Sequence, residues 1–291
     1  MRVIRFLASV IVAAVLVASA GMAMGSFAVT EAVSQEAIEK AITETGAIDE
    51  LTNNILAQNT VNLGGQYGQT MKEILKSDAM TEFFTAYTAG ALQAKVLGEE
   101  GTAGSSYYEE IGSDDLYQAF SSGTDQCLAK GSISMNEGER TIFDGALKTA
   151  MPMLAEGINY VLTQMNLTSF VDEDMQQQIE IAHEITSDRF RYGTIGLGAL
   201  AALLLFLLRW NRHTGFVWCG VCLLLVAAMF YIFAMMLEGT VESSSSFIAL
   251  SSRMLYIMVA YGLQKIAIIG GGAGVLCFPA CPIAKLIFRK R

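Results

Sequence analysis

Four cysteines near apolar stretches are the residues of this sequence best suited to metal or redox chemistry. Cys219 and Cys222 have CxxC spacing, and Cys277 and Cys281 have CxxxC spacing. Each pair falls at the same expected end of an apolar segment, where four thiolates could bind zinc or an iron–sulfur centre or exchange as dithiols. Cysteine is equally a small apolar residue that is buried or, near a membrane, palmitoylated. Because the second pair lacks CxxC spacing, we predict no metal site and no cofactor.

A glycine-rich stretch near the C-terminus resembles the phosphate-binding turn of dinucleotide-binding folds only superficially. In Ile266–Gly274 the third glycine of that motif would fall at Val275, and only 16 residues follow Val275, so no βαβ unit can form. Gly270 and Gly274 instead form a GxxxG pair, which is typical of close helix–helix approach in lipid. We therefore predict that they pack helices.

The histidines do not complete a catalytic or metal-binding set. The stretch Glu180–Glu184 contains ExxH, but a zincin helix needs a second histidine where this chain has Ser187. The only other histidine is His213, which we expect on the opposite side of a membrane, and neither histidine belongs to a Ser/His/Asp set. The sequence therefore predicts a protein that is not an enzyme.

The apolar stretch Phe216–Leu237 identifies the chain as a membrane protein. Its 22 residues carry no charge, and as a helix rising about 1.5 Å per residue they would cover about the 30 Å of a bilayer core. The basic turn Arg209–His213 precedes it, and the acidic stretch Glu238–Glu242 follows. Since cytoplasmic loops carry the excess of Lys and Arg, we expect this helix to run from inside to outside.

Three further stretches complete the predicted set of about four transmembrane helices. Phe6–Met24 is either an uncleaved anchor, which we favour, or a signal peptide with a cleavage site at Ala18–Ala20. Tyr192–Leu208 forms the second span. The last span is either Met254–Cys277, with Lys265 as a polar residue near the bilayer centre, or Ile266–Phe288, with Lys265 at the outer edge. We favour Met254–Cys277.

Charge separates the chain into three regions. Residues 29–190 hold 26 of the 28 acidic residues and 8 of the 19 basic ones, a net charge of −18. We expect residues 1–28 to form the membrane anchor, residues 29–190 an acidic extracytoplasmic helical domain, and residues 191–291 a membrane region with three spans and a basic cytoplasmic tail. So acidic a domain disfavours nucleic acid as a partner and favours basic proteins.

Helical periodicity predicts that the acidic region is a helical bundle. Helices are expected over Glu31–Thr45, Gln69–Lys76, Asp78–Leu97 and Ser113–Lys130, and then over a long segment that begins at the capping box Ser134–Glu137 and is kinked at Pro152. Another capping signature, Ser169–Asp172, opens a helix expected to run unbroken into the membrane. The first helix is likewise expected to continue from the first span.

A loop and the residues that follow it are the predicted contact site of the acidic region. Gly98–Ser106 is the clearest loop, and an aromatic and acidic patch follows it: Tyr107, Tyr108, Glu109 and Glu110. We predict this patch as a protein contact, although the tyrosines could equally close the end of the bundle. Cys127, the one cysteine of the region, is expected to be a free thiol or a bridge to another chain.

The predicted fold is thus an all-α integral membrane protein of the plasma membrane, with about four transmembrane helices and an extracytoplasmic helical bundle inserted between the first and second. Besides the lipid bilayer, its expected partner is a protein of a bacterial-type envelope, and homo-oligomer formation stays open. Its topology resembles that of permease-like subunits of ABC-type membrane systems. The alternative function is therefore a subunit of a transport or ABC-type permease-like complex.

Overall fold

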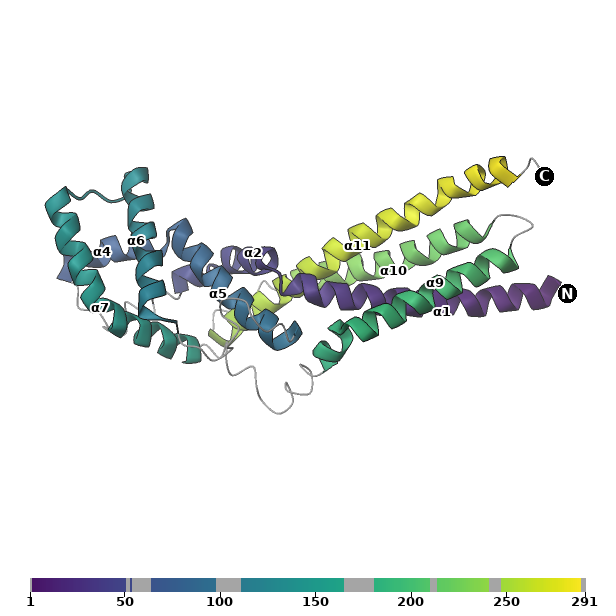
Figure 1. The fold of residues 1–291 in the computed structure, drawn as a ribbon, viewed down its shortest axis with the longest axis horizontal. Helices are drawn as coiled ribbons and strands as arrows, with labels where there is room; N and C mark the ends of the chain where they lie inside the picture. The colour runs from purple at the N-terminus through teal and green to yellow at the C-terminus, as the bar shows by residue number, and fades with distance from the viewer. Residues whose placement is uncertain are drawn as a thin grey trace. The chain divides into compact units, whose positions relative to one another are not determined.

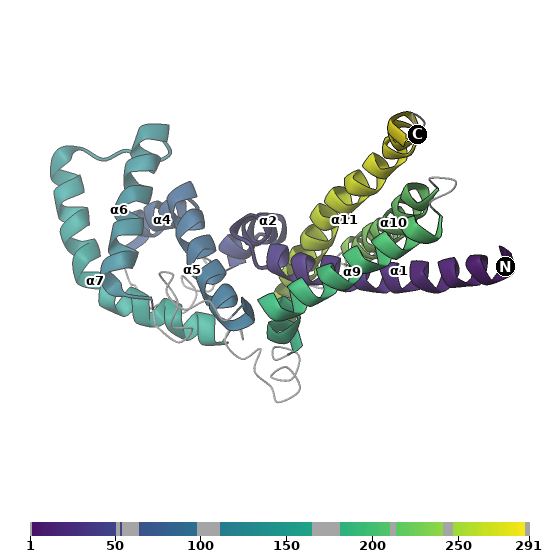
Figure 2. The same ribbon diagram turned by 45° about the vertical axis from the view of Figure 1, so that its right-hand side comes forward.

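Every secondary-structure element among the described residues of the computed structural model is an α-helix. The structure describes residues 2–50, 53, 64–97, 111–164, 181–209, 214–240 and 247–288. The chain divides into two compact units, each built of helices (Figures 1 and 2). We call Met1–Val33, Glu180–Glu242 and Tyr256–Arg291 the membrane unit, and Ser34–Ile179 with Ser243–Leu255 the inserted unit.

Four long apolar helices make up the membrane unit. They are α1 (Arg2–Ala32), α9 (Asp188–Leu208), α10 (Gly215–Gly239) and α11 (Phe247–Phe288), whose first nine residues belong to the inserted unit. Each is long and apolar enough to cross a membrane. The prediction of an all-helical chain with four such helices is confirmed.

The four helices alternate in direction. Contacts spread along the whole of α1 and α9 show that this pair is antiparallel, and they join Ser9 to Arg209, Ser19 to Gly198, and Ser26 to Arg191. Helix α11 is also antiparallel to α1, because Gly262 abuts Ala28 and Ala32 while Gly270 abuts Met24. The start of α1 and the end of α11 therefore lie at the same end of the unit (Figure 1).

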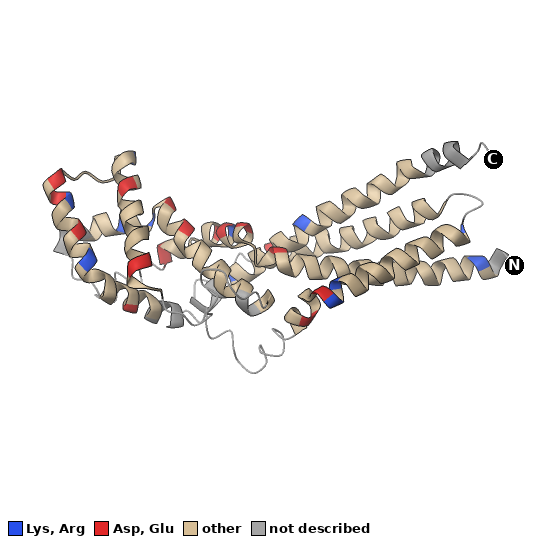
Figure 3. Ribbon diagram, in the orientation of Figure 1, with Lys and Arg blue, Asp and Glu red and all other residues tan. Residues whose placement is uncertain are grey.

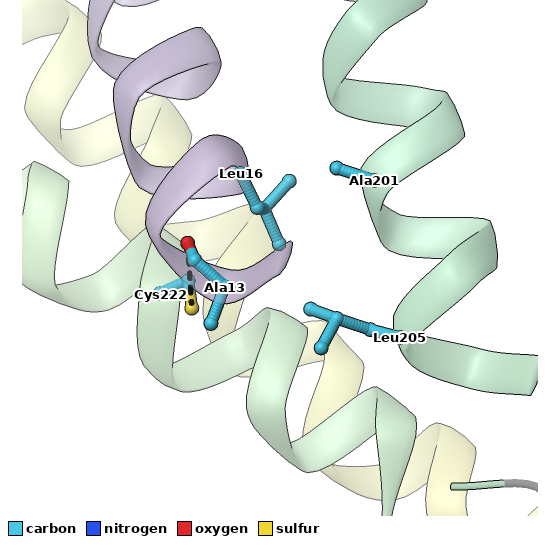
Figure 4. Close-up of a cluster of buried hydrophobic side chains, with 5 residues drawn as sticks. All are labelled: Ala13, Leu16, Ala201, Leu205 and Cys222. Carbon is cyan, nitrogen blue, oxygen red and sulfur yellow. Dashed lines mark hydrogen bonds between the residues drawn. The ribbon is translucent and has the colours of Figure 1, made fainter. Parts of the chain in front are cut away.

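Small clusters of buried side chains hold these helices together. In one of them Ala13 and Leu16 of α1 meet Ala201 and Leu205 of α9, with Cys222 of α10 closing one side (Figure 4). Large apolar side chains instead point outward, among them Leu203, Leu207, Met229, Ile232 and Met236, which are all more than half exposed. An apolar outer surface of this extent is expected of helices that face lipid.

The inserted unit has a conventional core made by the apolar faces of its helices. These are α2 (Gln35–Thr45), α4 (Gly64–Leu75), α5 (Asp78–Leu97), α6 (Ser113–Lys130) and α7 (Glu137–Gln164). Each contributes side chains that are at most 4% exposed, such as Ile38, Ile74, Phe84, Phe120, Leu147 and Ile158. At Gly123 a side chain would clash with Ser77 and Ile74, so this glycine lets α6 approach α4 closely.

The capping box predicted at Ser134 and Glu137 is wrong by two residues. Helix α7 begins at Glu137, and the reciprocal bonds of a capping box join Asn136 and Glu139. The Glu139 N–H donates to Asn136 Oδ1 and the Asn136 N–H donates to Glu139 Oε2, each at 2.9 Å. Asparagine is as good a cap as serine, and Asn136 has the glutamate at the third position that reciprocal capping requires.

The prediction that the bundle's first and last helices are continuous with membrane helices is wrong at both junctions. Helix α1 continues through Glu31 and ends at Ala32, and the Ser34 hydroxyl caps α2 by accepting from the Ala37 N–H. Residues 181–186 are helical, but the chain bends at Ser187, whose hydroxyl accepts from the Phe190 N–H and starts α9. A serine that caps a new helix therefore stands at each break.

Helix α7 is bent along its length, as the proline predicted (Figure 2). Pro152 lies inside it, where a proline removes a backbone hydrogen bond and clashes with the preceding turn. The predicted loop at Gly98–Ser106 and the predicted capping signature at Ser169–Asp172 lie outside the described residues.

Charge follows the division into units. Figure 3 shows acidic and basic residues distributed over the helices of the inserted unit, whereas the long helices of the membrane unit are almost uncharged along their middle parts. Between Phe6 and Thr30 of α1 there is no charged residue, and none lies between Tyr192 and Leu208 of α9.

Candidate functional site

The cysteines of the membrane unit point to different neighbours. Cys222 is 5% exposed and its thiol points toward the Ala13 carbonyl of α1, with 4.0 Å between sulfur and oxygen (Figure 4). Cys219 packs at the margin of the same cluster. On α11 the Cβ of Cys277 lies 3.1 Å from the place a Cβ would occupy at Gly220, so Cys277 is beside this part of α10.

These cysteines do not converge on a metal-binding set among the described residues. No group of three or more His, Cys, Asp or Glu side chains there could hold a metal ion, and the described cysteines are all free thiols. The side chain of Cys281 lies outside the described residues. What the arrangement does show is close packing of α10 on α11 through small residues.

Gly270 and Gly274 contact two different helices. A Cβ at Gly270 would lie 2.5 Å from the Met24 side chain of α1, and one at Gly274 would lie 3.1 Å from the Gly220 carbonyl of α10. The tightest contact among the described glycines lies at Gly262, where a Cβ would be 2.3 Å from the Ala28 carbonyl. The GxxxG pattern did not indicate Gly262 or Gly220, because their roles depend on which helices are neighbours.

Arg191 marks one end of the apolar part of the unit. Its Nε donates to Ser26 Oγ at 3.0 Å, its Nη2 donates to Thr30 Oγ1, and its guanidinium carbon lies 5.2 Å from the centre of the Phe27 ring. The α9 arginine is thereby bound to one face of α1. Arginine alkyl stems can lie along apolar surface while the charged head reaches the membrane boundary.

An ion pair joins α1 to α11 at the same end. Lys265 Nζ lies 2.9 Å from Glu31 Oε2 and 5.5 Å from the centre of the Tyr261 ring. Glu31 is the last charged residue of α1, so the pair places the ammonium of Lys265 level with the end of that helix. The part of α11 that is long and apolar enough to cross a membrane is Ser252–Ala280, which includes the predicted span Met254–Cys277 and contains Lys265. The prediction missed Glu31 because it assigned this residue to the helix that follows α1.

Arg209 lies at the other end of the apolar part of the membrane unit. Its Nε donates to Ser9 Oγ at 3.2 Å, and its guanidinium carbon lies 5.2 Å from the Trp218 ring centre and 6.0 Å from that of Phe6. The Ser9 hydroxyl itself donates to the Arg5 carbonyl at 2.8 Å. A guanidinium beside two aromatic rings is a favourable cation–π arrangement.

The spacing of the two arginines matches a bilayer. Arg191 and Arg209 are 18 residues apart on one helix, which corresponds to about 27 Å at a rise of about 1.5 Å per residue. The hydrocarbon core of a membrane is about 30 Å thick. Both arginines flank an uncharged run, so this spacing was visible in the sequence, although the role of each arginine was not predicted.

In the inserted unit, one asparagine holds the chain next to the predicted contact patch. The Ile111 N–H donates to Asn159 Oδ1 at 2.9 Å, and Asn159 Nδ2 donates to the Ile111 carbonyl at 3.3 Å. Ile111 is 4% exposed, so the chain is anchored on α7 where it leaves the patch. Tyr107, Tyr108, Glu109 and Glu110 lie outside the described residues.

Exposed ion pairs also join helices of the inserted unit. Lys130 pairs with Asp78, and this hydrogen bond raises the pKa of Lys130. Both side chains are more than half exposed, and such pairs contribute little stability. Cys127 is 4% exposed and its thiol points toward the Glu73 carbonyl, so it is a free, buried thiol. This burial disfavours the bridge to another chain.

Comparison with protein-family models, with curated proteins and with solved structures finds no match for this chain.

Proposed function

We propose that this chain is a non-enzymatic membrane protein whose inserted unit binds a protein partner on the extracytoplasmic face of a cell envelope. The observation that carries the proposal is that the inserted unit has its own apolar core and is formed mainly by the chain between the first two membrane helices. A domain of this size on a membrane anchor is suited to presenting a surface.

Recognition is assigned to the segment that ends at Ile111. Asn159 anchors the segment's C-terminal side to α7, and Tyr107 to Glu110 directly precede this anchor in the sequence. Tyrosines are frequent at the centre of protein interfaces. The two glutamates and the net charge of −18 over residues 29–190 favour a partner with a basic surface, mainly by accelerating association.

A transport role receives less support from the same features. Coupled transporters commonly use carboxylates inside the membrane, and the apolar runs of α1, α9 and α10 contain none. Glu31 lies at the end of α1 and pairs with Lys265. Glu31 therefore neutralises the positive charge of Lys265 and is not a free carboxylate within the apolar run of α1.

The side of the membrane is tested first. Single cysteines introduced as Ser105→Cys and Asn211→Cys are treated with a membrane-impermeant maleimide in intact cells. We expect labelling at position 105 and none at position 211, because basic residues flank the latter. The reverse pattern would place the inserted unit in the cytoplasm and remove the envelope partner from the proposal.

The partner is tested by photo-crosslinking in the full chain. A photoreactive amino acid at Tyr107 or Tyr108 should give one discrete adduct in intact cells, and the same group at the exposed residue Gln118 of α6 should not. Glu109→Lys with Glu110→Lys should abolish the adduct, as added salt should weaken it. An adduct of twice the chain mass would identify a second copy as the partner. The proposal fails if no adduct forms at Tyr107 or Tyr108.

A further inference from the structure

We infer that the end of the membrane unit at Arg209 is a binding site for the headgroup of an anionic phospholipid. The Arg209 side chain is held from three directions, by the Ser9 hydroxyl and by the rings of Phe6 and Trp218. Among the described residues it has no carboxylate within ion-pair distance. A positioned but uncompensated guanidinium is a good donor to phosphate.

The sequence around this end strengthens the charge argument. The start of α1 and the end of α11 lie at the same end of the membrane unit as Arg209, because the four helices alternate in direction, and the connection from α9 to α10 follows Arg209 in the chain. In the sequence, these stretches and the tail after α11 contain no acidic residue and eight basic residues, namely Arg2, Arg5, Arg209, Arg212, Lys285, Arg289, Lys290 and Arg291. In a membrane the nearest available anions are lipid headgroups, and each basic residue near the surface strengthens their attraction.

The opposite end of the unit provides the contrast. There Lys265 is paired with Glu31, and the hydroxyls of Ser26 and Thr30 accept from Arg191. Glu31 therefore offsets Lys265 at that end, and the sequence there also contains Asp188 and Glu238, whereas the segments around Arg209 contain no acidic residue.

The geometry places the Arg209 site at headgroup depth. Trp218 lies against Arg209, and tryptophan concentrates where the hydrocarbon core meets the headgroups. Arg209 lies about 27 Å along α9 from Arg191, close to the thickness of a bilayer core. A lipid whose phosphate contacts Arg209 can thus extend its acyl chains along the apolar outer surface of the unit.

Quenching of Trp218 fluorescence tests the inference directly. The chain has two tryptophans, so Trp210→Phe leaves Trp218 as the sole fluorophore. The full-length protein is placed in phosphatidylcholine nanodiscs that contain an equal fraction of either brominated phosphatidylglycerol or brominated phosphatidylcholine. We expect a preference for the anionic lipid of about fivefold, about what one basic residue near the surface contributes. Equal quenching by the two lipids would overturn the inference.

Matched arginine variants separate the Arg209 site from the general field of the basic tail. Arg209→Gln should remove most of the preference, and Arg191→Gln, at the other end of the same helix, should leave it intact. A preference that survives Arg209→Gln would refute the site. If Arg209→Gln does not fold, Arg209→Lys keeps the charge without the planar guanidinium and should still lower the preference; an unchanged value would then refute it.

Competition distinguishes a lipid site from a site for free phosphate. Unbrominated phosphatidylglycerol should relieve the excess quenching, and inorganic phosphate in the surrounding buffer should not. Relief by inorganic phosphate would show that the Arg209 site takes the free anion and would overturn the assignment to a lipid.

Discussion

Small residues and hydroxyls make the closest contacts of the membrane unit. Ser9, Ser19 and Ser26 of α1 are fully buried, and Gly262 and Gly220 permit backbone contacts between helices. Lipid is as apolar as leucine, so burying leucine between helices gains little, whereas close packing and interhelical hydrogen bonds do stabilise association. The large apolar side chains are accordingly left on the outside.

Replacing Gly262 should therefore destabilise the membrane unit. A Cβ there would lie 2.3 Å from the Ala28 carbonyl and 2.8 Å from the Ala32 nitrogen, and neither backbone atom can move without separating α1 from α11. We expect Gly262→Val to lower the free energy of unfolding of the membrane unit by about 1–3 kcal/mol, the usual range for overpacking. The measurement is the melting temperature in detergent, which should fall. Gly272→Val, with no atom within 4 Å, is the control, and equal melting of the two variants would contradict this packing.

Burial of Cys127 predicts that its thiol is unreactive in the folded chain. Because it is 4% exposed, maleimide should modify it only after denaturation, and non-reducing electrophoresis should show no dimer that depends on it. Ser122→Cys adds an exposed thiol on the same helix and should react at once. A native dimer abolished by Cys127→Ser would show that the buried position is wrong.

Three helices in this chain begin at a residue whose side chain accepts a hydrogen bond from the backbone of the first turn. Ser34, Asn136 and Ser187 each accept from a backbone N–H three residues ahead. Such caps satisfy donors that the first turn of a helix leaves unpaired. Ser34 also separates α1 from α2, and Ser187 separates the helical residues 181–186 from α9. At both junctions a local hydrogen bond therefore interrupts the helix.

Two alanine variants test whether Asn136 or Ser134 caps the start of α7. Asn136→Ala should destabilise the inserted unit by about 1 kcal/mol, while Ser134→Ala should have little effect. Labelling of the buried Cys127 thiol by maleimide provides the measurement, since it requires the unit to open. We expect Asn136→Ala to accelerate labelling about fivefold. Faster labelling in Ser134→Ala than in Asn136→Ala would restore the capping box at Ser134.

On the scale of the whole molecule, charged side chains lie at the two ends of the uncharged part of the membrane unit. Arg191 and the Glu31–Lys265 pair lie at one end and Arg209 at the other, separated by about the thickness of a hydrocarbon core. Lys265 is thereby level with Glu31, the last charged residue of α1.

Exchange of the two charges tests this placement. Glu31→Gln leaves Lys265 without its carboxylate and should lower the melting temperature, with a cost of about 1–3 kcal/mol for a lost charged hydrogen bond. The double variant Glu31→Lys with Lys265→Glu should recover most of that loss, because it restores the pair in reverse. A double variant no more stable than Glu31→Gln would show that the two side chains do not interact.

Features that depend on near neighbours in the chain were predictable. The uncharged runs required helices, since backbone groups in lipid must be satisfied within a helix or a closed barrel, and Pro152 predicted the bend of α7. Exact helix ends were harder, because several caps competed within a few residues. Ser134 and Asn136 both fit a capping pattern, and only the geometry of the first turn showed that Asn136 makes the bonds.

Sequence alone thus determined the all-helical class and the four apolar helices, because composition and periodicity act within a single segment. The tertiary structure decided which residues from distant parts of the chain contact one another. The pairing of Glu31 with Lys265 joins residues 234 positions apart, and Arg209 is held by Ser9 at the other end of the chain. Likewise, Gly262 needs to be glycine only because α1 passes over it. No local pattern encodes such contacts, since their free energy arises only when the helices pack.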